Sequence, residues 1–209
     1  FLVGMGLYFS FLGMTDFVEA PRSAGYGFGA TILQASLLFL MPGALSAAVT
    51  TLIGGRCIER FGARAVVAGG GLVGVVGFLM LAGWHEARWE VMVAGVLTNA
   101  YISLAYGALP ALIVSEVDNS DTAVATSLNG MFRKVGGAAA AALVGALLTP
   151  RTGGLAAESG FTAVFVLGAA TAAGSVLLVW LGRERSAAPR LAPLIPLPRP
   201  APAATELAA

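Results

Sequence analysis

The sequence predicts an all-α integral membrane protein with six transmembrane helices. Three observations support this prediction. The 209 residues are 57% hydrophobic and only 11% charged, whereas soluble domains carry roughly 25% charged residues. The mean hydropathy is +0.84. Runs of about 20 apolar residues recur, and each is long enough to cross a hydrocarbon core about 30 Å thick.

The apolar segments define the expected spans in chain order. The first, residues 1–15, is too short to span alone and starts without Met or a charged leader, so we expect a fragment that begins inside a helix. The other five expected spans are residues 29–53, 65–83, 91–114, 122–149 and 161–181. Residues 183–209 hold six of the ten prolines, and we expect them to form a disordered Pro/Ala-rich tail.

Lys and Arg are distributed unevenly between the two sides of these spans. If the connections alternate, nine of the 12 Lys and Arg residues fall on the side of the 54–64 loop and the tail. Such residues concentrate in short cytoplasmic loops. We therefore expect a multi-pass protein of the plasma membrane whose 54–64 loop and C-terminal tail are cytoplasmic.

The composition excludes several function classes. A net charge of +1 offers no basic surface for nucleic acid, and one Cys and one His provide no metal-ligand cluster. We expect no metal and no cofactor. We also expect no enzyme, because the spans hold no paired carboxylates or His ligands, and His85 is predicted to be a solvated loop residue. The dinucleotide-like spacing GGGLVG at 69–74 lies inside an apolar segment, so we interpret it as a helix-packing site, like Gly137, Ala141 and Gly145.

Polar side chains within the spans are candidates for a substrate cavity, which transporters build near the bilayer midplane. Those within 91–114 are spaced i, i+4 and i+7, and those within 122–149 also share one helical face. Hydrogen bonding between helices is an equally good interpretation of each. The candidates are Tyr8, Gln34, Asn99, Ser103, Tyr106, Thr126, Asn129 and Arg133.

Two of the spans contain residues with mechanical or electrostatic consequences. Pro42 frees a backbone carbonyl and is predicted to bend its span as a hinge. Arg133 starts roughly 8 Å inside the membrane boundary if Thr149 marks the opposite one. It is predicted either to face a cavity mouth or a contact between halves, or to be an anchor whose side chain snorkels to the interface.

Four charged residues lie close together in the stretch GGRCIERFGARAV, between the second and third expected spans of the chain. Its pattern Gly55-x-x-x-Glu59-Arg60-x-Gly62-x-Arg64 resembles the signature loop of the major facilitator superfamily, with Glu59 where Asp is usual and Ala63 where a basic residue is frequent. The resemblance implies a conformational-gating loop made of these residues. The alternative is a positively charged anchor without a switching role. From the chemistry alone, Gly55 is expected to lie where two helices meet closely.

The position of this loop before the tail suggests the C-terminal half of such a transporter. The stretch TAVATSLNGMFRKVGGAAAAALVGALL is similar to the fifth helix of a half in the fourteen-helix multidrug and proton antiporter branch. The resemblance implies efflux of a lipophilic or amphipathic small molecule by alternating access, with protons as the coupling ion. The implied partners are the lipid bilayer and an N-terminal half of six or eight helices. No Asp or Glu lies mid-span, so the coupling carboxylate is expected in that half. A self-contained six-helix protein that acts as a dimer is the alternative.

Overall fold

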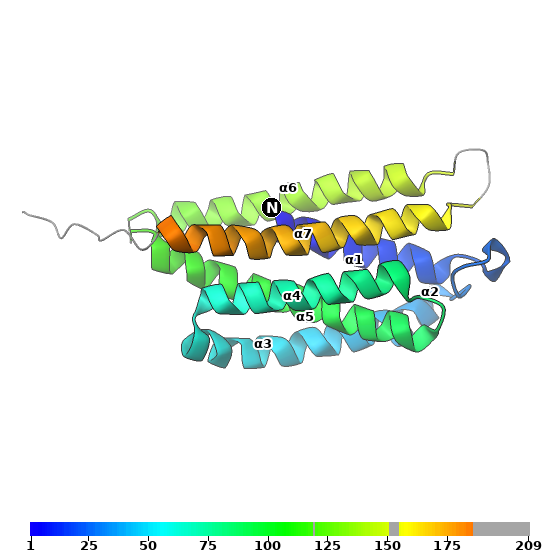
Figure 1. The fold of residues 1–209 in the computed structure, drawn as a ribbon, viewed down its shortest axis with the longest axis horizontal. Helices are drawn as coiled ribbons and strands as arrows, with labels where there is room; N and C mark the ends of the chain where they lie inside the picture. The colour runs from blue at the N-terminus through cyan, green and yellow to red at the C-terminus, as the bar shows by residue number, and fades with distance from the viewer. Residues whose placement is uncertain (119, 151–154, 186–209) are drawn as a thin grey trace, which may run out of the picture.

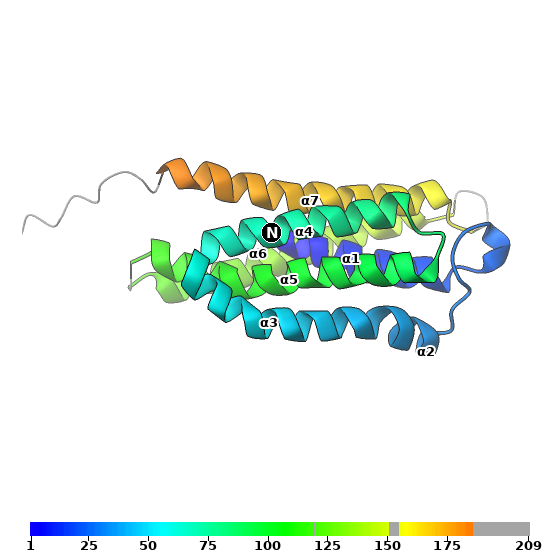
Figure 2. The same cartoon turned by 60° about the horizontal axis from the view of Figure 1, so that its bottom comes forward.

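The computed structural model describes residues 1–118, 120–150 and 155–185, and every regular element within these ranges is helical. The long helices lie side by side in one elongated bundle (Figures 1 and 2). They are α1 (Leu2–Glu19), α3 (Met41–Phe61), α4 (Ala63–Gly83), α5 (Arg88–Glu116), α6 (Thr122–Leu148) and α7 (Glu158–Arg185). Three short elements precede α3, namely η1 (Arg22–Ala24), α2 (Ile32–Gln34) and η2 (Ala35–Leu40). The prediction of an all-α helical bundle is confirmed.

Among the described helices, five are long and apolar enough to cross a membrane: Ile32–Phe61, Ala63–Gly83, Arg88–Glu116, Thr122–Leu148 and Glu158–Gly182. Helix α1, with 18 residues, is a further member of the bundle. Helix α7 continues to Arg185, inside the region that we expected to be disordered, because Arg and Glu are good helix formers. Residues 186–209, the rest of the expected tail, lie outside the described residues.

The helix that contains Pro42 changes its hydrogen-bond pattern rather than breaking. Residues Ala35–Leu40 form a π-helix, and the backbone N–H of Met41 donates to the carbonyl of Ser36, five residues back. Pro42 follows directly inside the continuous helix Ile32–Phe61, and its missing N–H leaves a carbonyl of the preceding turn without an intrahelical donor. Segments of π-helix inside a longer helix are rare and are often found at functional sites.

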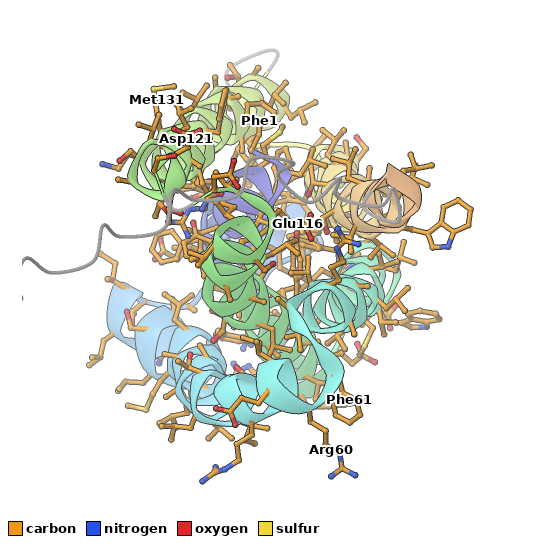
Figure 3. All side chains as sticks on the ribbon, turned by 90° about the vertical axis from the view of Figure 1, so that its left-hand side faces the viewer. Phe1, Arg60, Phe61, Glu116, Asp121 and Met131 are labelled. Carbon is orange, nitrogen blue, oxygen red and sulfur yellow. The ribbon has the colours of Figure 1, made fainter. Side chains whose placement is uncertain are left out.

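The helices surround α5 and α1. Helix α5 packs on α3, α4 and α1, while α1 also packs on α6 and α7, and α4 packs on α7. Viewed along the bundle, α3 and α6 lie at separate edges with α5 between them (Figure 3). Both edge helices keep many large apolar side chains exposed, among them Leu45, Leu52, Leu128 and Phe132. These faces suit contact with lipid or with another apolar helix bundle.

Small residues allow the close helix packing that the sequence predicts, at most but not all of the expected positions. A Cβ atom at Gly70 would lie 3.2 Å from Leu104 Cβ, and one at Gly137 would lie 2.5 Å from the ring of Tyr8. The prediction for these glycines is confirmed. It is wrong for Gly145, because a Cβ atom there would have nothing within 4 Å among the described residues. That part of α6 turns this face away from its neighbours.

A single residue joins α3 to α4 at one end of the bundle. Gly62 adopts φ +84°, a left-handed value that favours glycine. The chain can therefore reverse between Phe61 and Ala63 without a longer loop. We call this end of the bundle the inner end; it also holds the connection between α5 and α6. The end with residues 20–31, 84–87, 149–150 and 155–157 is the outer end.

Candidate functional site

A cavity of about 160 Å³ lies between α1, the π-helical segment η2 with the start of α3, and α5. Most of its surface is apolar, and Ser10 and Asn99 are its polar residues. The lining consists of Leu7, Ser10, Phe11, Met14, Leu40, Ala44, Asn99 and Ile102. A site of this kind accepts an apolar group and can orient it through one or two hydrogen bonds.

Asn99 is the sequence-predicted candidate that reaches this cavity. Its Nδ2 atom donates to the carbonyl of Gly95 at 2.9 Å, one turn earlier in α5. The same nitrogen would lie 2.5 Å from a Cβ atom at Gly43, so the amide packs directly on the backbone of α3. In the described part of the chain its Oδ1 atom accepts no hydrogen bond, which leaves an acceptor at the cavity wall.

Ser10 was not among the predicted residues. Its hydroxyl lies 2.9 Å from Thr98 Oγ1, and Thr98 in turn donates to the carbonyl of Gly95 at 3.1 Å. Both side chains are buried. A serine in an apolar span has no periodicity that distinguishes a cavity position from a buried contact, so the sequence held no signal for it.

Two other candidates lie away from the cavity. Ser103 Oγ donates to the carbonyl of Ala47 at 2.8 Å and lies 2.6 Å from Thr51 Oγ1, so it joins α5 to α3. For Ser103 the structure favours interhelical hydrogen bonding. Gln34 lies in the first turn of its helix, where its Oε1 accepts from the backbone N–H of Thr31 at 3.3 Å in a capping box. Its side chain is therefore occupied with starting the helix.

The structure brings Arg133, Tyr106 and Tyr8 together from three helices. The guanidinium carbon of Arg133 lies 4.2 Å from the centre of the Tyr106 ring, a close cation–π contact. On the neighbouring α1, a Cβ atom at Gly4 would clash with the backbone oxygen of Arg133. One turn further outward, the Tyr8 ring lies against Gly137. Arg133 is half-buried and about 16 Å from the inner end of α6.

The remaining candidates on α6 extend from this group toward the inner end. Thr126 is exposed and Asn129 is half-buried. Among the described residues, neither side chain makes a hydrogen bond, so both keep their polar atoms available. Together with Arg133 they form a polar stripe on a helix whose other exposed residues are largely apolar, including Val124, Leu128 and Met131.

At the inner end, Arg64 of the expected gating loop makes an ion pair that the sequence did not reveal. Its Nη2 atom donates to Glu116 Oε1 at 2.8 Å and so joins the start of α4 to the end of α5. About one third of each side chain is exposed, 32% for Arg64 and 36% for Glu116. The two residues are 52 positions apart, so spacing along one helix could not have predicted the pair.

The other loop residues point outward at this end. Glu59 and Arg60 are exposed on the last turns of α3, and Arg60 lies 5.5 Å over the ring of Phe61. Figure 3 shows Arg60 and Phe61 projecting away from the bundle, whereas Glu116 lies nearer its centre. Gly55 makes no close helix contact within the described residues, since a Cβ atom there would have nothing within 4 Å, and the expectation that two helices meet there stays a prediction. The buried glycine is its neighbour Gly54, which faces Leu104.

The outer end is closed by an aromatic cluster around Phe17. The ring of Phe17 lies 5.0 Å from that of His85 and 6.0 Å from that of Tyr26. His85 is not the solvated loop residue that we predicted. Its side chain is 13% exposed, with Nδ1 at 2.9 Å from the Leu81 carbonyl and Nε2 at 3.0 Å from Glu158 Oε1.

Tyr26 joins the same cluster from the connection between α1 and α2. Its hydroxyl donates to the backbone carbonyl of Ala156. Burial, and secondly the negative charge of Glu158, raise the pKa of Tyr26 above its usual value of 10.0. Residues from three outer connections are therefore tied to one another.

Comparison with known proteins supplies one match. A family model described as Major Facilitator Superfamily matches residues 1–207. Searches of curated proteins and of solved structures found no match.

Proposed function

Because the chain belongs to the Major Facilitator Superfamily, whose members are membrane transporters and not enzymes, we propose that it exports a lipophilic or amphipathic small molecule. Export is by alternating access in exchange for protons. Residues 1–182 form the C-terminal six-helix half of a transporter of the fourteen-helix multidrug antiporter type. The protein lies in the plasma membrane, with the 54–64 loop and the C-terminal tail in the cytoplasm.

The observation that carries this proposal is the mostly apolar cavity beside a π-helical segment. Its walls from α1 and α5 suit an apolar cargo, and Asn99 offers one hydrogen-bond acceptor. Arg133 and Tyr106 lie toward the inner end from Asn99, since residue 106 follows residue 99 by about two turns of α5. A molecule with an apolar body and one polar group matches an apolar cavity that is followed by polar side chains toward the inner end.

The inner end supports a gating role for the loop. Arg64 is held by Glu116 within the same bundle, while Glu59 is exposed and Gly55 has open space around it. Glu59 and Gly55 therefore present an uncovered surface to which a second helix bundle can dock. A carboxylate next to the N-terminus of a helix in that second bundle would contribute about 0.3–1 kcal/mol. That is enough to bias two conformations separated by a few kcal/mol without locking either.

The test uses the full-length transporter in inverted membrane vesicles with ethidium as a lipophilic probe. An imposed proton gradient is expected to drive ethidium into the vesicles, and nigericin, which collapses the gradient, is expected to abolish uptake. Asn99→Ala is expected to reduce uptake severalfold. Ser115→Ala, an exposed position on the same helix, serves as the matched control.

Ethidium uptake that is unchanged by nigericin would contradict proton coupling. If the native protein proves to be a dimer of six-helix chains in cross-linking, the assignment to one half of a longer transporter is wrong, and the dimeric carrier replaces it.

A further inference from the structure

A second cavity lies on the outside of the bundle, far from the candidate substrate cavity. It is a groove of about 380 Å³ between α4 and α7, close to the inner end. Its floor is formed by Ala65 and Ala68 of α4 and by Val176 of α7, and Phe61 and Trp180 flank it. None of these residues belongs to the wall of the substrate cavity. The groove therefore needs a separate explanation.

Helix geometry explains why the groove opens here. Further outward, α4 and α7 are in very close contact, because a Cβ atom at Gly71 would lie 2.5 Å from Val176 Cγ2 and 3.2 Å from Ser175 Oγ. Toward the inner end, Ala65 and Ala68 replace glycines on α4, and the groove lies between these alanines and Val176 and Val179 of α7.

The mouth of the groove combines exposed aromatic rings with positive charge. Phe61 is 63% and Trp180 is 59% exposed. Trp and Tyr side chains are enriched at the level of lipid headgroups, which suits Trp180. Arg64 lines the groove, and the guanidinium of Arg60 lies over the Phe61 ring at 5.5 Å. An apolar slot with arginines at its mouth matches the two parts of a phospholipid molecule.

Arg64 can bind a phosphate and keep its partner Glu116. The ion pair uses the Nη2 atom, whereas a guanidinium carries five N–H donors in a fixed fork. Donors on the other nitrogen atoms stay available to a second oxyanion. Among the described side chains, Glu59, Glu116, Asp118 and Asp121 are the carboxylates at this end of the bundle, and none of them lines the groove. Glu116 offsets part of the charge of Arg64, and Arg60 adds a second positive charge beside the Phe61 ring.

We propose that this groove binds one phospholipid with an anionic headgroup from the adjacent leaflet. An acyl chain lies in the slot against Ala65, Ala68 and Val176. The phosphate is held by Arg64 and, above the Phe61 ring, by Arg60. The bound lipid fills the space between α4 and α7 and ties these helices to the membrane surface beside the expected gating loop.

The test measures contact between lipid and Trp180 in the full-length protein. Bromine atoms on an acyl chain quench tryptophan fluorescence only at close range. The purified transporter is reconstituted in phosphatidylcholine vesicles that contain increasing fractions of dibrominated phosphatidylglycerol or dibrominated phosphatidylcholine. The signal of Trp180 is the difference between the wild-type protein and Trp180→Phe. We expect half-quenching at about fivefold less phosphatidylglycerol, the effect of one unpaired basic residue near the membrane surface, because Glu116 already offsets the charge of Arg64.

Matched variants separate a built site from general surface charge. Arg60→Gln with Arg64→Gln is expected to abolish the preference for phosphatidylglycerol. Arg56→Gln removes one charge from an exposed position of α3 outside the groove and is expected to keep the preference. Equal quenching by the two lipids in the wild-type protein overturns the proposal, and so does an equal loss of preference in Arg56→Gln.

A steric variant covers the case in which loss of Arg64 impairs folding. Ala68→Trp fills the floor of the groove while leaving all charges in place. The fluorescence of the added tryptophan is measured in the double variant Ala68→Trp with Trp180→Phe and is subtracted. The remaining Trp180 signal is expected to be quenched less by both lipids. Undiminished, headgroup-selective quenching in this variant contradicts the proposed position of the acyl chain. Fluorescence quenching is measured without transport, so its result tests the lipid site independently of the proposed function.

Discussion

The ring of Tyr101 lies directly on the backbone of Gly74. A Cβ atom at residue 74 would be 2.5 Å from the Cγ atom of Tyr101, closer than real Cβ contacts. Tyr101 is fully buried, and both residues lie in the middle of their helices. The packing of α4 on α5 thus depends on the absence of a side chain at this position.

Gly74→Ala is expected to destabilise the protein, because overpacking a tight interface costs about 1–3 kcal/mol. The midpoint of thermal unfolding in detergent measures this. Gly69→Ala is the matched control, since a Cβ atom there has nothing within 4 Å in the described residues, and it should be tolerated. Equal midpoints for the two variants would show that the contact with Tyr101 relaxes at no cost.

The contact between Arg133 and Tyr106 predicts that substitutions which remove the guanidinium or the ring impair transport, whereas one that keeps the ring does not. Arg133→Ala and Tyr106→Leu are each expected to reduce transport severalfold, because a cation–π contact contributes about 0.5–2 kcal/mol depending on its burial and Arg133 is half-buried. Tyr106→Phe keeps the ring face and should retain most activity. Transport by the full-length protein is compared at equal membrane expression. Lys134→Ala, an exposed neighbour, controls for loss of charge. Unchanged transport in Arg133→Ala would favour the snorkelled anchor.

The ion pair between Arg64 and Glu116 is partly exposed, so its removal should have a small effect on stability. Exposed pairs contribute about 0–1 kcal/mol after solvent screening. Glu116→Gln is therefore expected to lower the unfolding midpoint far less than Gly74→Ala does. A drop in the unfolding midpoint as large as that of Gly74→Ala would mean that the ion pair is needed to hold α4 and α5 together. The pair would then not behave as an exposed surface pair.

The hydrogen bond of Tyr26 predicts a pH dependence at the outer end. Its pKa is raised above 10.0 in the folded protein by burial and then by Glu158. A raised folded pKa means that the neutral phenol stabilises the fold below the unfolded pKa and that this contribution is lost as pH rises through the folded pKa. Resistance of residues 20–31 to proteolysis should thus exceed that of Tyr26→Phe at pH 8 and converge with it at alkaline pH, once the pH passes the raised pKa of Tyr26. A difference that persists at high pH would contradict this.

The sequence predicts the helical membrane fold well because that fold depends on local quantities. Segment length and apolar content suffice to expect helices at the positions of α3 to α7, and glycines four apart correctly indicated the packing sites at Gly70 and Gly74. The same spacing failed at Gly145, because it does not say which face meets a neighbour. The glycine pair at 54–55 is a second case in which the sequence does not tell which face contacts a neighbour, since residue 54 is buried and residue 55 has open space around it.

The candidate site was harder to predict, because a polar residue within a span has several uses. Asn99 lies at the cavity, Ser103 one turn later bonds to α3, and Gln34 caps its own helix. Nothing in their local sequence distinguishes these three roles. The depth of Arg133 in its span predicts a special role, yet its partner Tyr106 lies 27 positions away on a different helix, as the cation–π contact shows.

By itself the sequence determined that this protein is a multi-span membrane protein of the Major Facilitator Superfamily, because burial in lipid demands apolar length and the loop motif is local. The tertiary structure decided which residues meet. It placed His85 on Glu158, Arg64 on Glu116 and Tyr106 under Arg133. Each of these contacts joins segments far apart in the sequence, and the rotation and spacing of the helices that bring them together are set by the packing of the whole bundle rather than by any one segment.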